Sequence, residues 1–298
     1  MSRVSIFVVV AFIGVTVLPA CVALSENSNW QAIPTSITNN VPKPDTNDEM
    51  TGDYLANLPA DFIFPTDAAG QKLLAEYGAL FIARGGVQVP RRVVFENEVQ
   101  VATFQTSAGE AREVMGGITI TLQPGAMKAL KAAIAEAGRV SITPRGKDAA
   151  KRSYAMTVSL WASRVEPGLN HWVAKGRISQ EDAKRIRALS PYEQVPEILT
   201  LETKGIYFAK SLSKSIIYSV APPGSSQHLS MLALDVSEYD NANVRAVLAK
   251  HGWFQTVLSD LPHFTYLGVP AADLPGLGLK KVQSDGRTFW VPNLSPAN

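Results

Sequence analysis

Apolar residues recur at helical spacing in five segments of the chain. In the first, Leu73, Leu74, Tyr77, Leu80 and Phe81 fall on one face, and Thr66 or Asp67 can cap the start. In another, Pro124 suits a first helical turn and Gly138 an end. The predicted helices span residues 67–83, 124–137, 154–164, 179–189 and 240–251.

Short segments that alternate or are wholly apolar predict strands. They cover residues 87–105, 118–122, 140–146, 205–209, 215–220, 252–257 and 263–268. The tail beyond residue 268 contains four prolines and is predicted to be loop. Strands and helices do not alternate regularly, so the pattern favours an α+β fold, a small antiparallel sheet flanked by helices, over a doubly wound sheet.

The N-terminal segment predicts export. Residues 4–18 are almost wholly apolar, follow Arg3, and are too short for a typical membrane span. The chain's single cysteine, Cys21, follows Leu18-Pro19-Ala20, which resembles a bacterial lipobox whose cysteine is lipidated. The alternative is an ordinary signal peptide with a chance cysteine near its cleavage site. Residues 1–21 are therefore interpreted as signal peptide and lipobox, which predicts a periplasmic or cell-envelope protein anchored to a membrane.

Polar residues and prolines fill the segment that follows. Residues 22–53 are rich in Asn, Thr, Ser and Pro and predict a flexible tether. Residues 54–110 are predicted to form an accessory subdomain, and residues 111–298 the domain that carries the chemistry. The spacer between Arg145 and His228 is long and is expected to hold an inserted helical segment.

Composition limits the chemistry further. The chain has 298 residues, of which 46% are hydrophobic, enough for one large domain or two small ones. Its 28 basic and 26 acidic residues give a net charge of +2 without a clustered basic region, so no nucleic-acid partner is expected. Because the mature chain lacks a cysteine beyond Cys21, a metal ion must be bound by His, Asp or Glu.

Two of the four histidines have surroundings that indicate a metal site. His228 follows a turn-forming loop, Asp235 lies seven residues on in an apolar run, and His263 stands between Pro262 and an aromatic residue. Two imidazoles and one carboxylate can bind a tetrahedral zinc ion and leave a fourth position for water. Asp260, three residues before His263, can serve as a general base. The alternatives are a capping role for Asp235 and simple packing for His263.

These residues resemble the signature of the zinc D-alanyl-D-alanine carboxypeptidase family, which includes the vancomycin-resistance carboxypeptidases and dipeptidases. That signature reads Ser-x-His-x-x-Gly-x-Ala-x-Asp, followed by Glu-Pro-Trp-His before an aromatic-rich strand. Ser226, His228, Ala233 and Asp235 match its first part, and His263 matches its final histidine. The similarity extends loosely over residues 123–268 and is specific only over residues 222–268.

Two positions depart from the family signature. Met231 replaces its glycine, and Asp260 replaces its catalytic glutamate with a side chain one methylene shorter. The family also uses an arginine in a Gly-Tyr-Arg-Ser-like loop to contact its substrate. The nearest counterpart is interpreted as Arg145, in Ser-Ile-Thr-Pro-Arg-Gly, or else Arg145 is a surface turn residue. Ser226 is expected either to hydrogen-bond the substrate backbone or to cap its own loop.

The resemblance implies an exported zinc metallopeptidase that hydrolyses peptidoglycan peptides, with D,D-carboxypeptidase action favoured. Endopeptidase and dipeptidase action stay open. The metal ligands implied are His228, Asp235 and His263, with Asp260 as the base. Because Met231 and Asp260 depart from the signature, the alternative is a non-catalytic cell-wall-binding module that retains the metal site.

Overall fold

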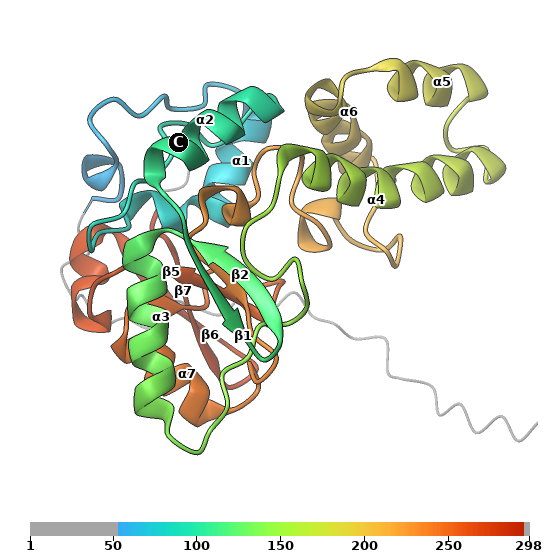
Figure 1. The fold of residues 1–298 in the computed structure, drawn as a ribbon. Coiled ribbons are helices and arrows are strands. Elements are labelled where there is room, and N and C mark those ends of the chain that lie inside the picture. The colour runs from blue at the N-terminus through green and yellow to red at the C-terminus, as the bar shows by residue number, and fades with distance from the viewer. Residues whose placement is uncertain (1–52, 295–298) are drawn as a thin grey trace, which may run out of the picture. The chain divides into compact units, whose positions relative to one another are not determined.

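The computed structural model describes residues 53–294, which form one compact unit. The predicted fold class is confirmed, because small antiparallel sheets are surrounded by helices (Figure 1). The signal peptide, Cys21 and the tether up to residue 52 lie outside the described residues. None of the described helices is both long and apolar enough to span a membrane.

The structure has α-helices in both halves of its described part. They are α1 (Ala68–Tyr77), α2 (Glu98–Ala108), α3 (Pro124–Ala137), α4 (Tyr154–Ala174), α5 (Gln180–Ala188), α6 (Pro191–Thr203) and α7 (Ala242–Lys250). Helix α3 begins at Pro124 and ends before Gly138, as predicted. Helix α1 begins after Asp67, whose side chain accepts from the Gly70 amide, but its last predicted turn is a 3-10 helix, Gly78–Ile82. The capping of α5 by Ser179 is also confirmed.

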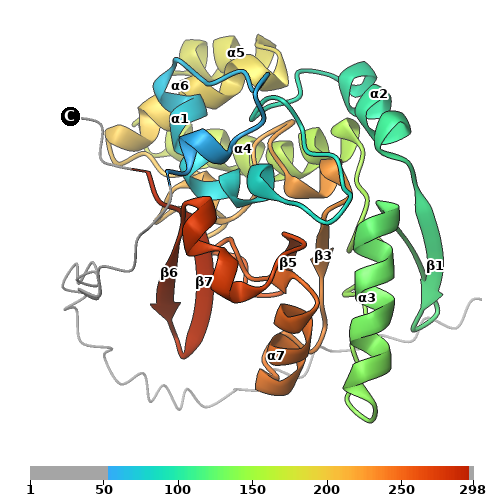
Figure 2. The ribbon, with the colours of Figure 1, turned by 90° about the vertical axis from the view of Figure 1, so that its left-hand side faces the viewer.

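The strands form three small antiparallel sheets. Strands β1 (Ala111–Met115) and β2 (Ile118–Leu122) make one hairpin, and β6 (Leu279–Ser284) and β7 (Arg287–Pro292) make another. Between them, β3 (Ala233–Asp235), β4 (Trp253–Phe254) and β5 (His263–Tyr266) form a sheet in the order β3-β5-β4. Helices α3 and α7 lie side by side near this sheet (Figures 1 and 2).

The prediction of strands across residues 87–105 was wrong. Residues 87–97 form a loop with one isolated bridge between Arg92 and Ile63, and residues 98–105 belong to helix α2. The Asn97 side chain accepts a hydrogen bond from the Gln100 amide, and Gln100 Oε1 accepts one from the Glu96 amide. This N-cap pattern starts a helix. Only Val101 and Gln105 of α2 are buried, while Val99 is 74% exposed. The helix therefore has almost no apolar stripe from which its period could be recognised.

The strands predicted at residues 140–146, 205–209 and 215–220 are also absent. Residues 205–220 instead fold as a loop around the buried carboxylate of Glu202. That carboxylate accepts hydrogen bonds from the amides of Phe208 (3.2 Å) and Ile216 (2.7 Å) and from the Ser215 hydroxyl. One side chain thus supplies the acceptors that a neighbouring strand would provide.

The tail, predicted to be loop, contains the β6–β7 hairpin. Its turn is formed by Asp285 and Gly286, which have φ angles of 49° and 69°. An Asp-Gly pair with positive φ at both positions is the preferred connection for a two-residue hairpin turn. The prolines that suggested a loop lie outside the paired residues or at the end of β7.

Residues 54–110, expected to be an accessory subdomain, pack into the same hydrophobic core as the central sheet. Tyr54 and Leu74 belong to one buried cluster with Phe264 and Trp290. The Gln105 side chain donates to the Leu229 carbonyl. This segment is therefore part of the framework that surrounds the candidate site.

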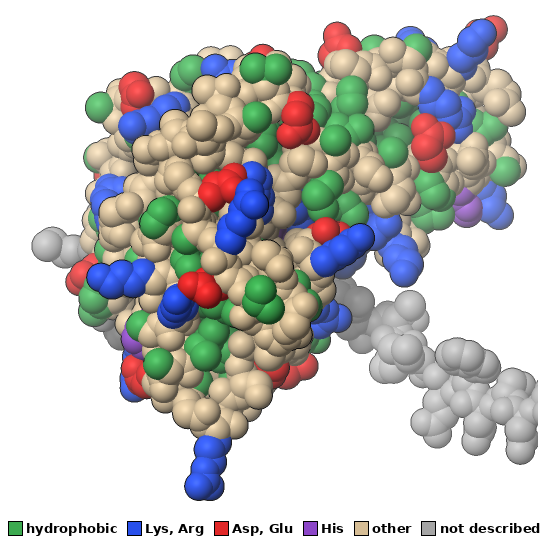
Figure 3. Space-filling model, viewed as in Figure 1, with side chains coloured by type: hydrophobic (Ala, Val, Ile, Leu, Met, Phe, Trp, Pro, Cys, Tyr) green, Lys and Arg blue, Asp and Glu red, His purple; other side chains and the backbone are tan. Residues whose placement is uncertain are grey.

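The spacer between Arg145 and His228 holds the expected helical segment. Helices α4, α5 and α6 form a lobe that stands out from the sheets (Figures 1 and 2). Helix α4 was predicted only to residue 164, and it continues through Pro167 to Ala174. On the face shown in Figure 3, acidic and basic side chains are interspersed.

Candidate metal centre

Strand pairing brings together two residues that lie far apart in the sequence. In the antiparallel β3–β5 pair, Asp235 is directly opposite His263. Residues paired in this way project from the same face of the sheet and lie within side-chain reach. The register, with Leu234 opposite Phe264, directs the apolar neighbours to the other face.

A tight turn before β3 positions the third residue. His228 lies in the 3-10 helix Gln227–Ser230, and Met231 ends that helix in the left-handed conformation, with a φ of 57°. Glycine adopts this conformation without steric cost, whereas a side chain such as Met231 makes it strained. The family signature's glycine is therefore replaced without loss of the turn. The Met231 side chain is fully buried.

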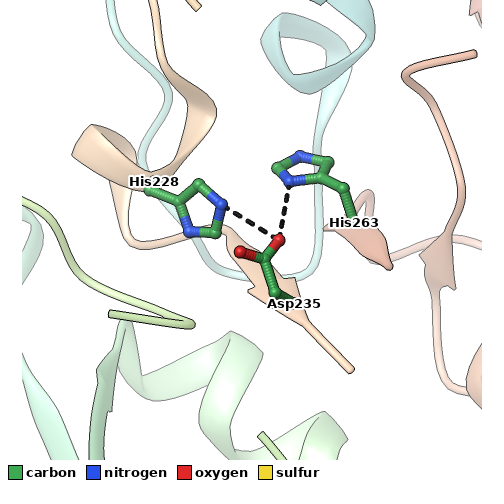
Figure 4. A group of neighbouring side chains, drawn as sticks. All are labelled: His228, Asp235 and His263. Atoms are coloured by element: carbon green, nitrogen blue, oxygen red, sulfur yellow. Dashed lines mark hydrogen bonds and ion pairs between the residues drawn. The ribbon is translucent and has the colours of Figure 1, made fainter. Parts of the chain in front are cut away.

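The three predicted residues converge on one point, as Figure 4 shows. Asp235 Oδ1 lies 3.3 Å from His228 Nε2 and 3.3 Å from His263 Nδ1. The candidate ligand atoms all lie within 4.8 Å of one another. Both histidines are buried, so the group is enclosed by protein on most sides. The grouping expected from the sequence is confirmed.

The hydrogen bonds of His228 leave Nε2 without a proton. Its Nδ1 lies 2.7 Å from the Ala150 carbonyl oxygen, which can only accept, so Nδ1 carries the hydrogen. In a neutral imidazole the other nitrogen then presents a lone pair. This Nε2 atom is buried and makes no hydrogen bond.

The proton of His263 is fixed by Gln227. The amide nitrogen of Gln227 donates to the Tyr77 carbonyl at 2.8 Å, which turns its Oε1 toward His263. His263 Nε2 lies 2.8 Å from that oxygen and therefore donates to it. Its Nδ1 consequently presents a lone pair toward Asp235. Partners of this kind set the tautomer and orientation of metal-binding histidines.

His228 Nε2 and His263 Nδ1 thus both face Asp235 Oδ1, and in the neutral tautomers set by Ala150 and Gln227 each nitrogen presents a lone pair to it. This arrangement is unfavourable in a buried setting unless a cation occupies the centre. His228, Asp235 and His263 therefore fit a metal ion, and they form a group that can hold one. The buried, unpaired Nε2 of His228 is the observation that supports this conclusion most directly.

The charges around the group keep its ligands in the metal-binding form. Burial lowers the pKa of His228, and the positive charge of Arg152 lowers it further, against the opposing effect of Asp235. Burial alone would raise the pKa of Asp235, but the neighbouring His228 and His263 outweigh it, and the pKa is lowered. Arg152 Nη2 also donates to Asp235 Oδ2 at 2.8 Å. Burial thus favours the neutral form of His228, in which Nε2 can bind a metal ion, and the surrounding groups favour the ionised form of Asp235.

A cavity of about 260 Å³ opens onto this group, and we call it the first cavity. Its lining combines polar and charged side chains with a few apolar ones. They include Tyr77, Arg152, Leu160, Arg164, Tyr218, Ser226, His228, Ser259, Asp260 and His263.

Asp260 lines the first cavity and is solvent-exposed. The His263 amide donates to the Asp260 carbonyl at 3.2 Å, so residues 260–263 form a turn. This turn brings the side chain of Asp260 to the same cavity as a candidate metal ligand, as the sequence predicted.

Ser226 also lines the first cavity and is buried. It precedes the 3-10 helix Gln227–Ser230, but its hydroxyl makes no capping hydrogen bond. The structure thus gives no support to the capping alternative. The hydroxyl remains available to a molecule in the cavity.

Arg145, expected to contact a substrate, does not line the first cavity. It is exposed, and its guanidinium lies over the Tyr239 ring, 5.4 Å from the centroid. The cavity instead contains Arg152 and Arg164. The sequence does contain an indication of Arg152. The Arg-Ser pair of the resembled Gly-Tyr-Arg-Ser loop also occurs at Arg152-Ser153. Gln227 was also missed, because an amide next to a histidine has no recognisable pattern.

The two remaining histidines lie elsewhere. His171 packs edge-on against Trp172, and His251 Nε2 pairs with Glu136 at 2.9 Å on the surface.

No protein-family model, curated protein or solved structure matches this chain. The interpretation of the site therefore rests on its own side chains.

Proposed function

We propose that this protein is an exported zinc metallopeptidase that hydrolyses peptidoglycan stem peptides as a D-alanyl-D-alanine carboxypeptidase. The observation that carries the proposal is the convergence of two imidazole lone pairs and a carboxylate, beside a cavity that also contains Asp260. The choice of a cell-wall substrate is supported by the sequence resemblance around residues 222–268.

Zinc suits the donor set. Two histidines and one carboxylate with an open position are a frequent ligand set of catalytic zinc. When bound, zinc would lower the pKa of a coordinated water and polarise the scissile carbonyl. His228, Asp235 and His263 would hold the ion. Ala150 and Gln227 would keep the two histidines oriented, and Arg152 would keep Asp235 oriented and ionised, through the contacts described above.

Asp260 is the proposed general base. It would accept a proton from the attacking water and deliver it to the leaving amine. Asp260 lines the same cavity as the candidate metal ligands, and a carboxylate in that place can act in this role. Asp260 is one methylene shorter than the glutamate of the resembled signature. The substrate and water must therefore approach the turn at residues 260–263 closely.

Arg164 is the proposed anchor for the substrate's terminal carboxylate. Its Nε donates to the Ser219 hydroxyl at 3.0 Å, and Nη1 donates to the Ser163 hydroxyl at 2.9 Å. These contacts hold the guanidinium at the cavity wall with neutral partners, so its charge is not cancelled there. Guanidinium groups bind carboxylates through paired hydrogen bonds. Ser226 would donate to the peptide backbone.

A direct test combines metal analysis with hydrolysis. The purified full-length protein, loaded with zinc, is incubated with a defined muropeptide that ends in D-Ala-D-Ala, and released D-alanine is quantified. We expect one zinc per chain and release of the terminal residue. His263→Ala should lose both zinc and activity, whereas His251→Ala, which alters a surface histidine, should keep both.

Two results would overturn parts of this proposal. Full zinc retention in His263→Ala would contradict the metal site. A parent protein that is fully loaded with zinc but releases no product from muropeptides would favour the alternative, a non-catalytic cell-wall-binding module. Cleavage at another peptide bond would reassign the enzyme to endopeptidase or dipeptidase action.

A further inference from the structure

A second cavity, of about 400 Å³, lies on the other face of strand β5. His263 lines the first cavity and the next residue, Phe264, lines the second. Successive residues of a strand point to opposite faces, so the sheet separates the two cavities. The second cavity is bounded by α7, β4 and the β6–β7 hairpin. Its volume lies within the range of small-molecule sites.

The interior of the second cavity is aromatic. Aromatic residues from three strands line it, among them Trp253, Phe264 and Trp290. Trp253 is completely buried, and Trp290 is 8% exposed. Flat aromatic side chains of this kind favour a ligand with a flat apolar body.

Positive charge collects on the same lining. Arg245, Lys281 and Arg287 line the cavity, and no acidic residue does. Asp240, which lies outside the lining, pairs with Arg287. Arg245 donates only to the Tyr239 and Asp240 carbonyl oxygens. Burial lowers the pKa of Arg245, and the charge of Arg287 lowers it further, as expected where positive charges are incompletely neutralised.

Two hydrogen-bond donors on the lining residues are unused. The indole Nε1 of Trp253 and the Nε of Arg287 are both buried and make no hydrogen bond. Buried donors are normally paired. Both groups are donors, so a partner that reaches them must accept hydrogen bonds.

From these observations we propose that the second cavity binds a small organic anion, with a flat apolar body against the aromatic residues and a carboxylate against Arg245, Arg287 and Trp253. The proposal does not depend on the metal site or on peptidase activity. A carboxylate satisfies both requirements of the lining, because it carries negative charge and accepts several hydrogen bonds.

Phenylacetate and phenylacetamide are suitable probes because they have nearly the same shape and differ in charge. The full-length protein, with nitrogen-15 in its five tryptophans, gives one indole resonance for each. Trp253→Phe and Trp290→Phe assign the two cavity resonances by their loss. We expect phenylacetate to shift both resonances in a saturable manner, with and without zinc. Phenylacetamide should bind about tenfold more weakly, the value of one charge-assisted hydrogen bond.

Variants locate the anion. Arg245→Gln and Arg287→Gln should each weaken phenylacetate binding several-fold. Lys280→Gln removes the same charge from an exposed position outside the cavity and should leave the affinity unchanged. If Arg287→Gln fails to fold, Arg245→Gln alone decides. Absence of a saturable shift of the Trp253 resonance, equal affinity for both probes, or an effect of Lys280→Gln as large as that of Arg245→Gln would overturn the proposal.

Discussion

Arg152 Nη2 donates to Asp235 Oδ2 at 2.8 Å, while the other oxygen of this carboxylate faces the two imidazoles. The Asp235 carboxylate thereby contacts a permanent cation through Oδ2 and faces the candidate metal position through Oδ1. The guanidinium stabilises the ionised form of Asp235 and orients it, so that Oδ1 is available as a ligand.

The first prediction concerns the pH at which zinc is released. Without Arg152, the pKa of Asp235 rises because its cationic partner is lost, and the pKa of His228 rises because a nearby positive charge is lost. Both changes help protons to compete with zinc. Arg152→Gln should therefore release zinc at a higher pH than the parent, as measured by metal retention during dialysis across acidic buffers. Arg145→Gln, outside the cavity, is the control and should match the parent; an unchanged profile in Arg152→Gln would contradict the role assigned to the ion pair.

The second prediction tests the orientation of His263. Gln227→Met keeps the approximate side-chain volume but removes the oxygen that accepts from His263 Nε2. Zinc affinity should fall by roughly 10- to 100-fold, the usual effect of losing such a partner. The control, Ser230→Ala, removes a buried hydrogen bond to the Gln227 backbone carbonyl in the same turn. Competition with a zinc chelator measures both, and equal affinities in the two variants would argue against a specific role for the Gln227 side chain.

The third prediction concerns the proposed base. Asp260→Asn should retain zinc, because Asp260 is not one of the converging ligands, but should lower turnover by roughly 10²-fold or more. Asp260→Glu should remain active. Asp273→Asn, at an exposed site outside the first cavity, serves as the matched control. D-alanine release is the measurement, and turnover at the parent rate in Asp260→Asn would exclude this residue as the base.

The fourth prediction concerns stability and Glu76. Burial raises the pKa of Glu76, against weaker opposing effects of Ser259 and Lys72. A carboxyl whose pKa is higher in the folded state stabilises the fold below its unfolded pKa, about 4.3, and loses this contribution as pH rises through the folded value. Glu76→Gln should therefore raise the free energy of unfolding at pH 7, with a smaller gain near pH 4.

The pKa shift of Glu193 has the opposite sign to that of Glu76, so its effect on stability should have the opposite pH dependence. The Ser190 hydroxyl and the Ser190 backbone amide lower the pKa of Glu193, so its contribution is present at neutral pH and is lost in acid. Glu193→Gln should lower stability at pH 7 and have less effect near pH 4. Denaturant titrations at the two pH values compare the variants. A loss of stability in Glu76→Gln at pH 7 would show that burial of the ionised Glu76 carboxylate does not destabilise the folded protein.

The fifth prediction concerns export. If Cys21 is lipidated, Cys21→Ser should abolish labelling by a fatty-acid analogue and release the protein from the membrane fraction. A parent protein that takes up no label, with the same membrane fraction as the variant, would indicate secretion or an uncleaved signal instead.

The candidate metal ligands could be recognised in the sequence because their chemistry and spacing are local. Asp235 is the seventh residue after His228, and His263 follows a proline and precedes an aromatic residue. Their convergence, in contrast, depends on the β3–β5 register, which pairs Asp235 with His263 across nearly 30 residues of intervening chain. Nothing in either strand taken alone specifies that pairing.

The errors in the fold have similar causes. Helix α2 buries little, so its cap at Asn97 was a better indicator than its hydrophobic pattern. The loop around Glu202 looked like two strands because its apolar residues are buried, although their backbone partners are carboxylate oxygens. The sequence indicated Arg145 at the site, whereas Arg152 and Arg164 line the cavity, because spacing along the chain cannot show which arginine faces a cavity.

The hydrogen bond from Gln227 to the Tyr77 carbonyl has a consequence for any attempt to shorten the protein. A fragment that starts at residue 111 would keep every candidate ligand but lose the Tyr77 carbonyl, and the Gln227 amide would be held only by Thr256 and Thr265. That amide could then rotate and present its nitrogen to His263, which would favour the wrong imidazole tautomer for metal binding. The minimal functional unit is thus set by an amide orientation, and it begins well upstream of the first ligand.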